Sequence, residues 1–225
     1  MLPLPYQSAE MATDHHRTLL DEAAARRRLR SARVGDAHRP VSTVGPRTAP
    51  GGRLWLTALK QAAAVQIRPI RAADALLLRD GFARLGPDSR RSRFLGAKNV
   101  LTTAEVRYLT EVDHHDHEAL VALNRVDGNG VGVARYIRDR DDVHSAEVAV
   151  TVVDDWQLRG IGTRLMVRLR RRALAEGITR FTALVLEENF GARRLMQHIP
   201  GSTTLVARDA DRLSYVVELA GPRFA

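Results

Sequence analysis

The stretch Gln157-Leu158-Arg159-Gly160-Ile161-Gly162-Thr163 decides the fold class. It follows an apolar run at 146–153 and opens a stretch, 160–176, whose apolar residues recur at helical spacing. Its two glycines allow the backbone to approach a ligand closely, and the free N–H groups of a first helical turn point at that ligand. The positive end of the helix dipole adds to this attraction. The stretch therefore predicts a strand-to-helix turn that binds an anion, and a pyrophosphate would fit.

As a bare pattern this turn is open to two interpretations. Many strand-to-helix turns use glycine for packing alone, so a ligand site and a packing feature remain equal alternatives at this point. The spacing excludes a Walker loop, which needs Gly-Lys-Ser/Thr, and it lacks the third glycine of the dinucleotide-binding fingerprint.

Helical and strand patterns alternate on both sides of this turn. Thr102 or Thr103 is expected to begin a helix, with Glu105 placed for a capping box. Asp127-Gly128-Asn129-Gly130 predicts a hairpin, because a tight turn needs residues that tolerate positive φ. Strands are expected at 65–68, 119–126, 131–137, 146–153, 179–186, 203–207 and 213–219, and helices at 72–85, after 102, at 160–176 and at 189–198. The resulting element order is βααβββαβαββ.

Composition excludes several classes of protein. The chain has 225 residues, 44% hydrophobic and 27% charged, which is typical of a globular protein. It contains no Cys, which excludes disulfide frameworks, thiol nucleophiles and Cys-ligated metal centres. No apolar run has the length of a membrane span and no signal-peptide pattern opens the chain, so we expect a cytoplasmic protein without a membrane partner.

The N-terminal segment differs from the rest of the chain. Residues 1–53 read as a basic extension rich in Pro and Gly with a helix favoured at 15–33, and residues 54–225 as the folded domain. The net charge of +9 suits a partner that carries phosphates, whether nucleic acid, anionic membrane or a phosphorylated cofactor. No aromatic residue interleaves the cluster Arg26 to Arg33, which argues against stacking on single-stranded nucleic acid.

Glu147 interrupts an otherwise apolar strand. Alternation places it on one face with Ala149, Thr151 and Val153. Burial would raise its pKa toward the range useful for a general base, and an acceptor lysine must lose a proton before it can attack. The alternative is a solvated charge near the start of the strand.

At this point the chain resembles the GNAT family of acyl-CoA-dependent N-acetyltransferases. Gln157, Gly160 and Gly162 match the family signature Gln/Arg-x-x-Gly-x-Gly/Ala, and Glu188-Asn189-x-x-Ala192 matches its later Asn-x-x-Ala segment. The element order over residues 64–220 is also that of the family. Four further stretches are similar to the acetyltransferase domain of bacterial Pat-type protein lysine acetyltransferases, namely 67–71, 109–113, 131–136 and 146–149.

The resemblance implies an α/β (α+β) fold, in which a mixed, mostly antiparallel central sheet with splayed strands is flanked by helices. It implies direct acetyl transfer from acetyl-CoA to an amine, preferably a protein lysine, with Glu147 as the general base. It also implies an acetyl-CoA site, in which main-chain groups at 150–152 hold the pantetheine and thioester, the turn binds the pyrophosphate and the next helix contributes one asparagine. The residues expected to bind the cofactor are Val150, Thr151, Val152, Gln157, Leu158, Arg159, Gly160, Ile161, Gly162, Thr163 and Asn189.

Three points separate the chain from the family pattern or leave alternatives open. Leu195-Met196 stand where many members carry the Tyr that protonates the departing thiolate, so no general acid is assigned. The run Asp113-His114-His115-Asp116-His117 has poor geometry for a metal, and no metal is expected. The alternative functions are acetylation of a small amine, non-catalytic sensing of acyl-CoA and nucleic-acid binding, and the sequence makes no prediction of oligomeric state.

Overall fold

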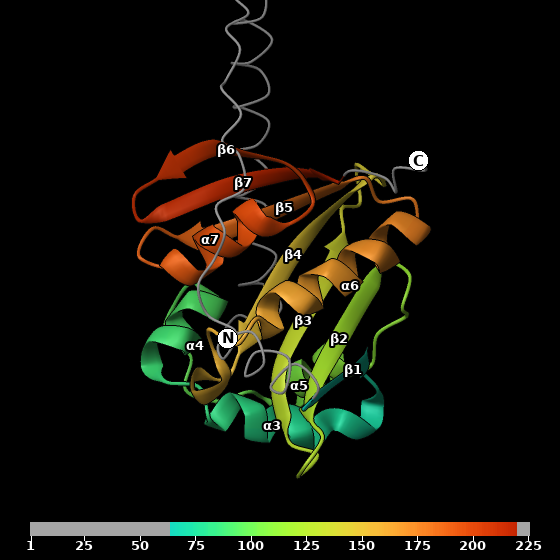
Figure 1. The fold of residues 1–225 in the computed structure, drawn as a ribbon, viewed down its shortest axis with the longest axis vertical. Coiled ribbons are helices and arrows are strands. Elements are labelled where there is room, and N and C mark those ends of the chain that lie inside the picture. Colours follow the sequence, from blue (N-terminus) through green and yellow to red (C-terminus); the bar gives the residue numbers. More distant parts are fainter. Residues whose placement is uncertain (1–63, 220–225) are drawn as a thin grey trace, which may run out of the picture.

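A computed structural model of the protein describes residues 64–219. Its centre is a seven-stranded sheet with the order β1-β2-β3-β4-β5-β7-β6 (Figure 1). All neighbouring strands are antiparallel except β4 and β5, which are parallel. The strands are β1 (Val65–Pro69), β2 (His117–Asn124), β3 (Gly130–Arg138), β4 (Ser145–Val152), β5 (Arg180–Leu186), β6 (Gly201–Asp209) and β7 (Arg212–Leu219).

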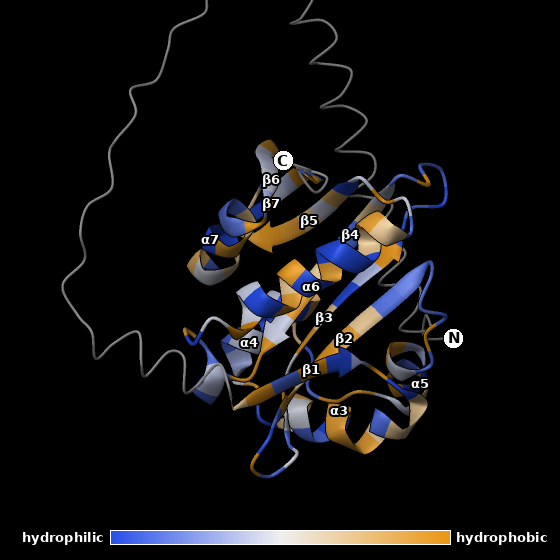
Figure 2. Cartoon of the chain, turned by 45° about the vertical axis from the view of Figure 1, so that its right-hand side comes forward, coloured by the Kyte–Doolittle hydropathy of each residue, from blue (hydrophilic) through white to orange (hydrophobic). Residues whose placement is uncertain are grey.

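Helices cover both faces of this sheet, which confirms the predicted fold class. The helix α6 lies across β2, β3 and β4 on one face, and α3 and α5 lie on the other (Figures 1 and 2). The α-helices are α3 (Ala75–Ala83), α4 (Pro87–Phe94), α5 (Thr103–Thr110), α6 (Ile161–Ala175) and α7 (Phe190–His198), and the short 3₁₀ helices are η1 (Ala72–Asp74) and η2 (Asp154–Trp156).

The predicted order of elements is wrong at one place, because it lacks α4. This helix has the sequence PDSRRSRF, which carries no apolar stripe, so hydrophobic periodicity gives no signal for it. Its start follows from Pro87 in the first turn, and it ends at Leu95, which adopts a left-handed conformation with φ of 53°. The capping box of Thr102 and Glu105 and the hairpin after β2 are confirmed.

The larger core packs between α6 and the sheet. Leu165, Met166 and Leu169 of α6 are almost fully buried there, against Tyr136 of β3 and Phe181 of β5. A smaller cluster beneath the other face joins α3 to α5. The amphipathic pattern of 160–176 therefore folds as expected, with its apolar side against the sheet.

The parallel pairing of β4 with β5 is short. Only Ser145, Ala146 and Glu147 pair with β5, at Arg180, Phe181 and Thr182. On its other side β4 pairs with β3 along Ala146 to Val152. Beyond Glu147 the two central strands diverge (Figure 1), and this is the predicted splay.

The predicted extension at 1–53, its helix at 15–33 and the predicted domain start at 54 lie outside the described residues. Within 64–219, no helix combines the length and the hydropathy that crossing a membrane requires.

Candidate active site

Beyond Glu147, in a stretch that we call the gap, one side of the β4 backbone no longer pairs with β5. The Val153 N–H donates to the Val131 carbonyl at 3.0 Å, and backbone groups alternate sides along a strand. The main-chain groups of Thr151 therefore pair with β3, whereas those of Val150 and Val152 point toward the gap. Main-chain groups of Val150, Thr151 and Val152 were predicted to hold the thioester. Those of Val150 and Val152 face the gap, whereas those of Thr151 do not.

The predicted anion-binding turn lies at the start of α6. Gly160 is the N-cap of this helix with φ of 74°, a conformation that favours glycine, and it has no side chain with which to cap the first-turn amides. A Cβ on Gly162 would lie 3.4 Å from Leu195 of α7, so this second glycine permits close packing of two helices. Leu158, Arg159, Gly160 and Thr163 are exposed, Gly162 is half-buried and Ile161 is buried. The contact of Gly162 agrees with the packing interpretation of the motif, and the anion-binding interpretation stays a prediction.

The Gln157 side chain is bonded within the protein. Its amide donates to the Val152 carbonyl at 3.1 Å, to Ser89 Oγ at 3.1 Å and to Asp154 Oδ1 at 3.0 Å. Asp154 also accepts from the Gly86 N–H at 2.8 Å and from the Ser89 hydroxyl. The end of β4 is thereby tied to the first turn of α4.

No sequence pattern pointed to Asp154 or Ser89, since neither belongs to a motif. The pair Asp154-Asp155 directly after an apolar strand was the available signal.

Asn189 is the N-cap of α7. Its Oδ1 accepts from the Ala192 N–H at 2.9 Å, which satisfies one of the free amides of the first turn. It follows the end of β5, and α7 packs against α6 near Gly162. Asn189 and the predicted anion-binding turn therefore lie on the same side of the sheet, the side covered by α6.

Glu147 lies on the opposite face of the sheet, as the alternation predicts. Its side chain is half-buried, and among its electrostatic neighbours is Arg93 of α4. Burial lowers the pKa of the Arg93 guanidinium, while attraction to Glu147 and then to Tyr108 works in the opposite direction. A half-buried carboxylate facing a guanidinium is not a freely solvated charge.

A buried arginine completes this cluster. Arg135 of β3 is 4% exposed, and its guanidinium donates to His117 Nε2 at 3.0 Å and to the Leu109 carbonyl at 3.2 Å. Burial and then the charge of Arg93 lower the pKa of Arg135 to about 9. No sequence prediction gave Arg135 a role, although a charged residue inside the run 131–137 was a detectable signal.

Thr151 carries a hydroxyl that the described residues leave without a partner. Its Oγ1 is buried, and no donor or acceptor within 64–219 bonds to it. Because buried polar groups are almost always hydrogen-bonded, a ligand or an ordered water has to supply the partner of this hydroxyl. A thioester oxygen would fit this position.

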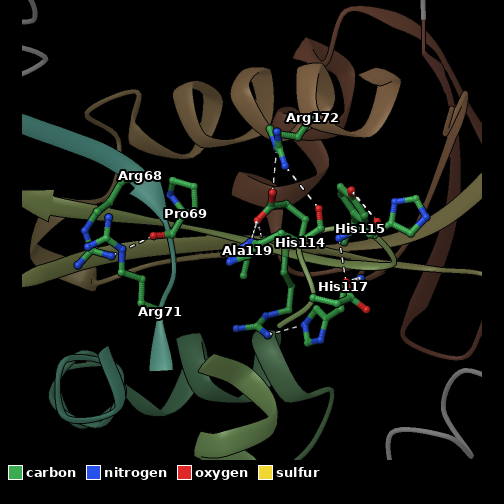
Figure 3. Close-up of polar contacts among 12 residues, drawn as sticks. Arg68, Pro69, Arg71, His114, His115, His117, Ala119 and Arg172 are labelled. Carbon is green, nitrogen blue, oxygen red and sulfur yellow. Dashed lines mark hydrogen bonds and ion pairs between the residues drawn. The ribbon is translucent and has the colours of Figure 1, made fainter. Parts of the chain in front are cut away.

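The His-rich run 113–117 has a structural role. Figure 3 shows Arg172 of α6 reaching toward this segment, where its guanidinium donates to the fully buried Glu118 at 2.9 Å. Glu118 also accepts from the Ala119 N–H at 2.9 Å and lies 2.8 Å from His114 Nδ1. Within the described part of the chain, no cluster of three or more His, Asp or Glu side chains has a metal-binding arrangement.

The arginine-rich side of α6 also bonds within the protein. Arg164 and Arg168 donate to the Val65 and Ile67 carbonyls at 3.3 and 2.6 Å, and so cover the free edge of β1. Arg91 of α4 forms ion pairs with Glu188 and, at 3.0 Å, with Asp211. These contacts hold the peripheral elements around the site.

Comparison with known proteins identifies the family. The family model described as Acetyltransferase (GNAT) family matches residues 88–199. Acetyltransferase Pat of Mycolicibacterium smegmatis is 35% identical over 133 residues, which make up 59% of this chain and 40% of that protein. Acetyltransferase PA5475 of Pseudomonas aeruginosa is 35% identical over 120 residues, 52% of this chain and 64% of that protein. The matched region thus spans less than two thirds of either relative.

A solved structure agrees with these matches. The crystal structure of the GNAT domain of S. lividans PAT superposes with a TM-score of 0.64 at 25% identity, and the match covers 69% of this chain and 90% of that domain. The splayed parallel pair and the glycine turn at the start of α6 lie within residues 88–199, the region that the family model matches. The chain therefore contains a domain of the GNAT family of acetyltransferases.

Proposed function

We propose that the protein transfers an acetyl group in the cytoplasm from acetyl-CoA to an amine, with a protein lysine as the preferred acceptor. One observation carries the proposal. The pairing of β4 with β5 ends at Glu147, which leaves a gap with the free amides of α6 on one face of the sheet and a carboxylate on the other. A long thioester that enters from the α6 face can therefore present its acyl group to a base on the opposite face.

The residues of the turn and the gap fit the cofactor. The main-chain amides from Leu158 to Thr163 would bind its pyrophosphate, helped by the dipole of α6. Main-chain groups of Val150 and Val152 would bind the pantetheine arm, and Asn189 would contact the cofactor from the start of α7. The bound cofactor supplies an activated acyl group attached to a thiolate leaving group.

Glu147 would act as the general base. Its carboxylate removes a proton from the acceptor ammonium, directly or through a water, which frees the nitrogen lone pair to form the new amide bond. The Val152 N–H, which points into the gap, donates to the thioester oxygen as negative charge develops there. The C–S bond then breaks and the sulfur leaves as a thiolate.

No general acid is part of this proposal. Leu195 and Met196 carry no dissociable proton, so neither can protonate a leaving group. A CoA thiolate is a tolerable leaving group, and we propose that it leaves without a dedicated acid.

A Glu147→Gln variant tests the proposal. The full-length protein is titrated with acetyl-CoA by calorimetry, and thiol release is followed with lysine peptides, polyamines and amino acids. Loss of a general base lowers kcat by about 10²- to 10⁴-fold, while the dissociation constant for acetyl-CoA should change by less than about threefold, because Glu147 faces away from α6. Glu111→Gln, an exposed carboxylate at the end of α5, is the matched control.

Each of the other outcomes would favour one of the alternative functions. Absence of acetyl-CoA binding would overturn the cofactor assignment. Binding without transfer to any amine would favour non-catalytic sensing of acyl-CoA. Turnover with polyamines or amino acids in place of lysine peptides would assign a small-amine acetyltransferase.

A further inference from the structure

A partly open pocket lies beneath β4, on the face that carries Glu147. It is a cavity of about 70 Å³ between the sheet and α3. Leu78, Gly81 and Phe82 of α3 form one wall, and Ala149 and Thr151 of β4 form the other. Among its described lining residues only Arg93, Arg135 and Thr151 are polar, so the space is mainly apolar.

The two arginines do not make the cavity an anion site. The Arg135 guanidinium is already bonded to His117 and to the Leu109 carbonyl. Arg93 has the Glu147 carboxylate among its electrostatic neighbours. The remaining walls are aliphatic or aromatic, and they favour an apolar occupant.

The cavity borders the route that an acyl group has to take. A thioester that enters from the α6 face must cross the gap beside β4 to reach the face of Glu147. On that face, Ala149 and Thr151 belong both to the strand that edges the gap and to the cavity wall. The carbon chain beyond the thioester carbonyl would therefore point into the cavity, with the carbonyl oxygen near the unpartnered Thr151 hydroxyl.

We propose that this cavity is an acyl-chain pocket and that the protein binds short straight-chain acyl-CoA thioesters longer than acetyl-CoA, namely propionyl- and butyryl-CoA. The inference rests on the proposed function, because it needs the thioester in the gap. A cavity of about 70 Å³ exceeds the roughly 10–15 Å³ that a cavity needs to hold one water, and it limits the chain to a few carbons.

Calorimetric titration of the full-length protein tests the pocket without knowledge of the acceptor. The ligands are CoA, acetyl-, propionyl-, butyryl- and succinyl-CoA. Each methylene buried in an apolar site strengthens binding by about fourfold, so butyryl-CoA should bind about 15-fold more tightly than acetyl-CoA. Equal or falling affinity with chain length would overturn the pocket, and so would tighter binding of succinyl-CoA than of butyryl-CoA.

A Gly81→Leu variant links the effect to the cavity. A Cβ at Gly81 would lie 4.0 Å from the Gly130 carbonyl oxygen, and leucine has a higher helix propensity than glycine, so the side chain fills the space without breaking α3. The affinity for acetyl-CoA should stay within about twofold and the advantage of butyryl-CoA should disappear. Gly81→Ala should remove part of that advantage, and it replaces Gly81→Leu in the test if the larger side chain disturbs folding.

Ala83→Leu is the control, because it adds the same side chain at an exposed position of the same helix. An equal loss of affinity for every acyl-CoA in Gly81→Leu, with Ala83→Leu unchanged, would overturn the inference while leaving the proposed function intact. Absence of binding by the wild-type protein to any of the five ligands would overturn the proposed function instead, and the inference with it.

Discussion

Replacing Thr151 with valine should stabilise the protein and weaken its cofactor site. The substitution exchanges one hydroxyl for a methyl group at a position where Oγ1 is buried without a partner among residues 64–219. An unsatisfied buried hydroxyl costs about 1–3 kcal/mol. Allowing for imperfect fit of the new methyl, we expect a gain of about 1 kcal/mol, which raises Tm by about 2–4 °C in a chain of this size.

The same substitution removes a donor to the thioester oxygen. A neutral hydrogen bond contributes about 0.5–1.5 kcal/mol, so the dissociation constant for acetyl-CoA should rise by about 2- to 12-fold. Thermal unfolding with and without acetyl-CoA, together with calorimetric titration, measures both effects in one set of samples. The variant should be the more stable protein without ligand and should gain less stability from it.

Thr151→Ser is the matched control, because it keeps the hydroxyl and loses only the methyl group. It should be less stable than the wild type and bind acetyl-CoA with nearly unchanged affinity. The reasoning fails if Thr151→Val unfolds at a lower temperature, since the hydroxyl would then make a stabilising bond within the protein. It also fails if the valine variant binds acetyl-CoA as tightly as the wild type does.

Three further predictions concern the elements around the site. Burial and then the charge of Arg135 lower the pKa of His117 to about 4. Between pH 6.5 and 4 the unfolded chain therefore binds a proton at this histidine that the folded protein does not. The free energy of unfolding is highest above pH 6.5 and falls as the pH drops toward 4. The loss should reach about 2 kcal/mol, given the partial exposure of the ring, and His117→Asn should flatten the dependence of Tm on pH. Glu118→Ala removes the fully buried carboxylate that His114, the Ala119 N–H and Arg172 contact. It should lower the free energy of unfolding in urea by about 3 kcal/mol, whereas Glu118→Gln, which keeps an acceptor, should lower it less. Asp154→Ala releases α4 from the end of β4 and should raise KM for the amine more than it lowers kcat, an effect that the exposed neighbour Asp155→Ala should not produce.

Local patterns predicted the elements that have an apolar side. The helix α6 and the strand β4 follow from hydrophobic periodicity, and the start of α5 follows from the capping box at Thr102. These signals lie within a few residues of the feature that they predict. The helix α4 has no such signal, because its eight residues present no apolar face and it is held by contacts with Asp154, which lies 65 to 68 residues away along the chain.

The candidate site likewise contains some features that sequence patterns predict and others that depend on tertiary packing. The glycine turn and the face of Glu147 follow from spacing and alternation alone. Arg93, Arg135 and Thr151 meet only because β3, β4 and α4 pack around one cavity, and sequence spacing carries no information on that packing. The Gln157 side chain is a related case, since its position in a motif does not reveal that its amide bonds to the protein itself.

The divergence of β4 from β5 explains why the site has two chemically different sides. A continuous sheet would separate the amides at the start of α6 from the carboxylate of Glu147, because side chains of neighbouring strands close the space between the two faces. Because the pairing stops at Glu147, β5 does not pair with the backbone groups of Val150 and Val152 that β3 leaves unused, and the proposed path of the thioester runs beside them. The charged end of a cofactor can then remain on the polar, exposed turn while its acyl group reaches a half-buried base and an apolar cavity. A variant that extended the parallel pairing past Glu147 would keep every proposed binding group and still lose acetyl transfer, because the acyl group could no longer reach the face of Glu147.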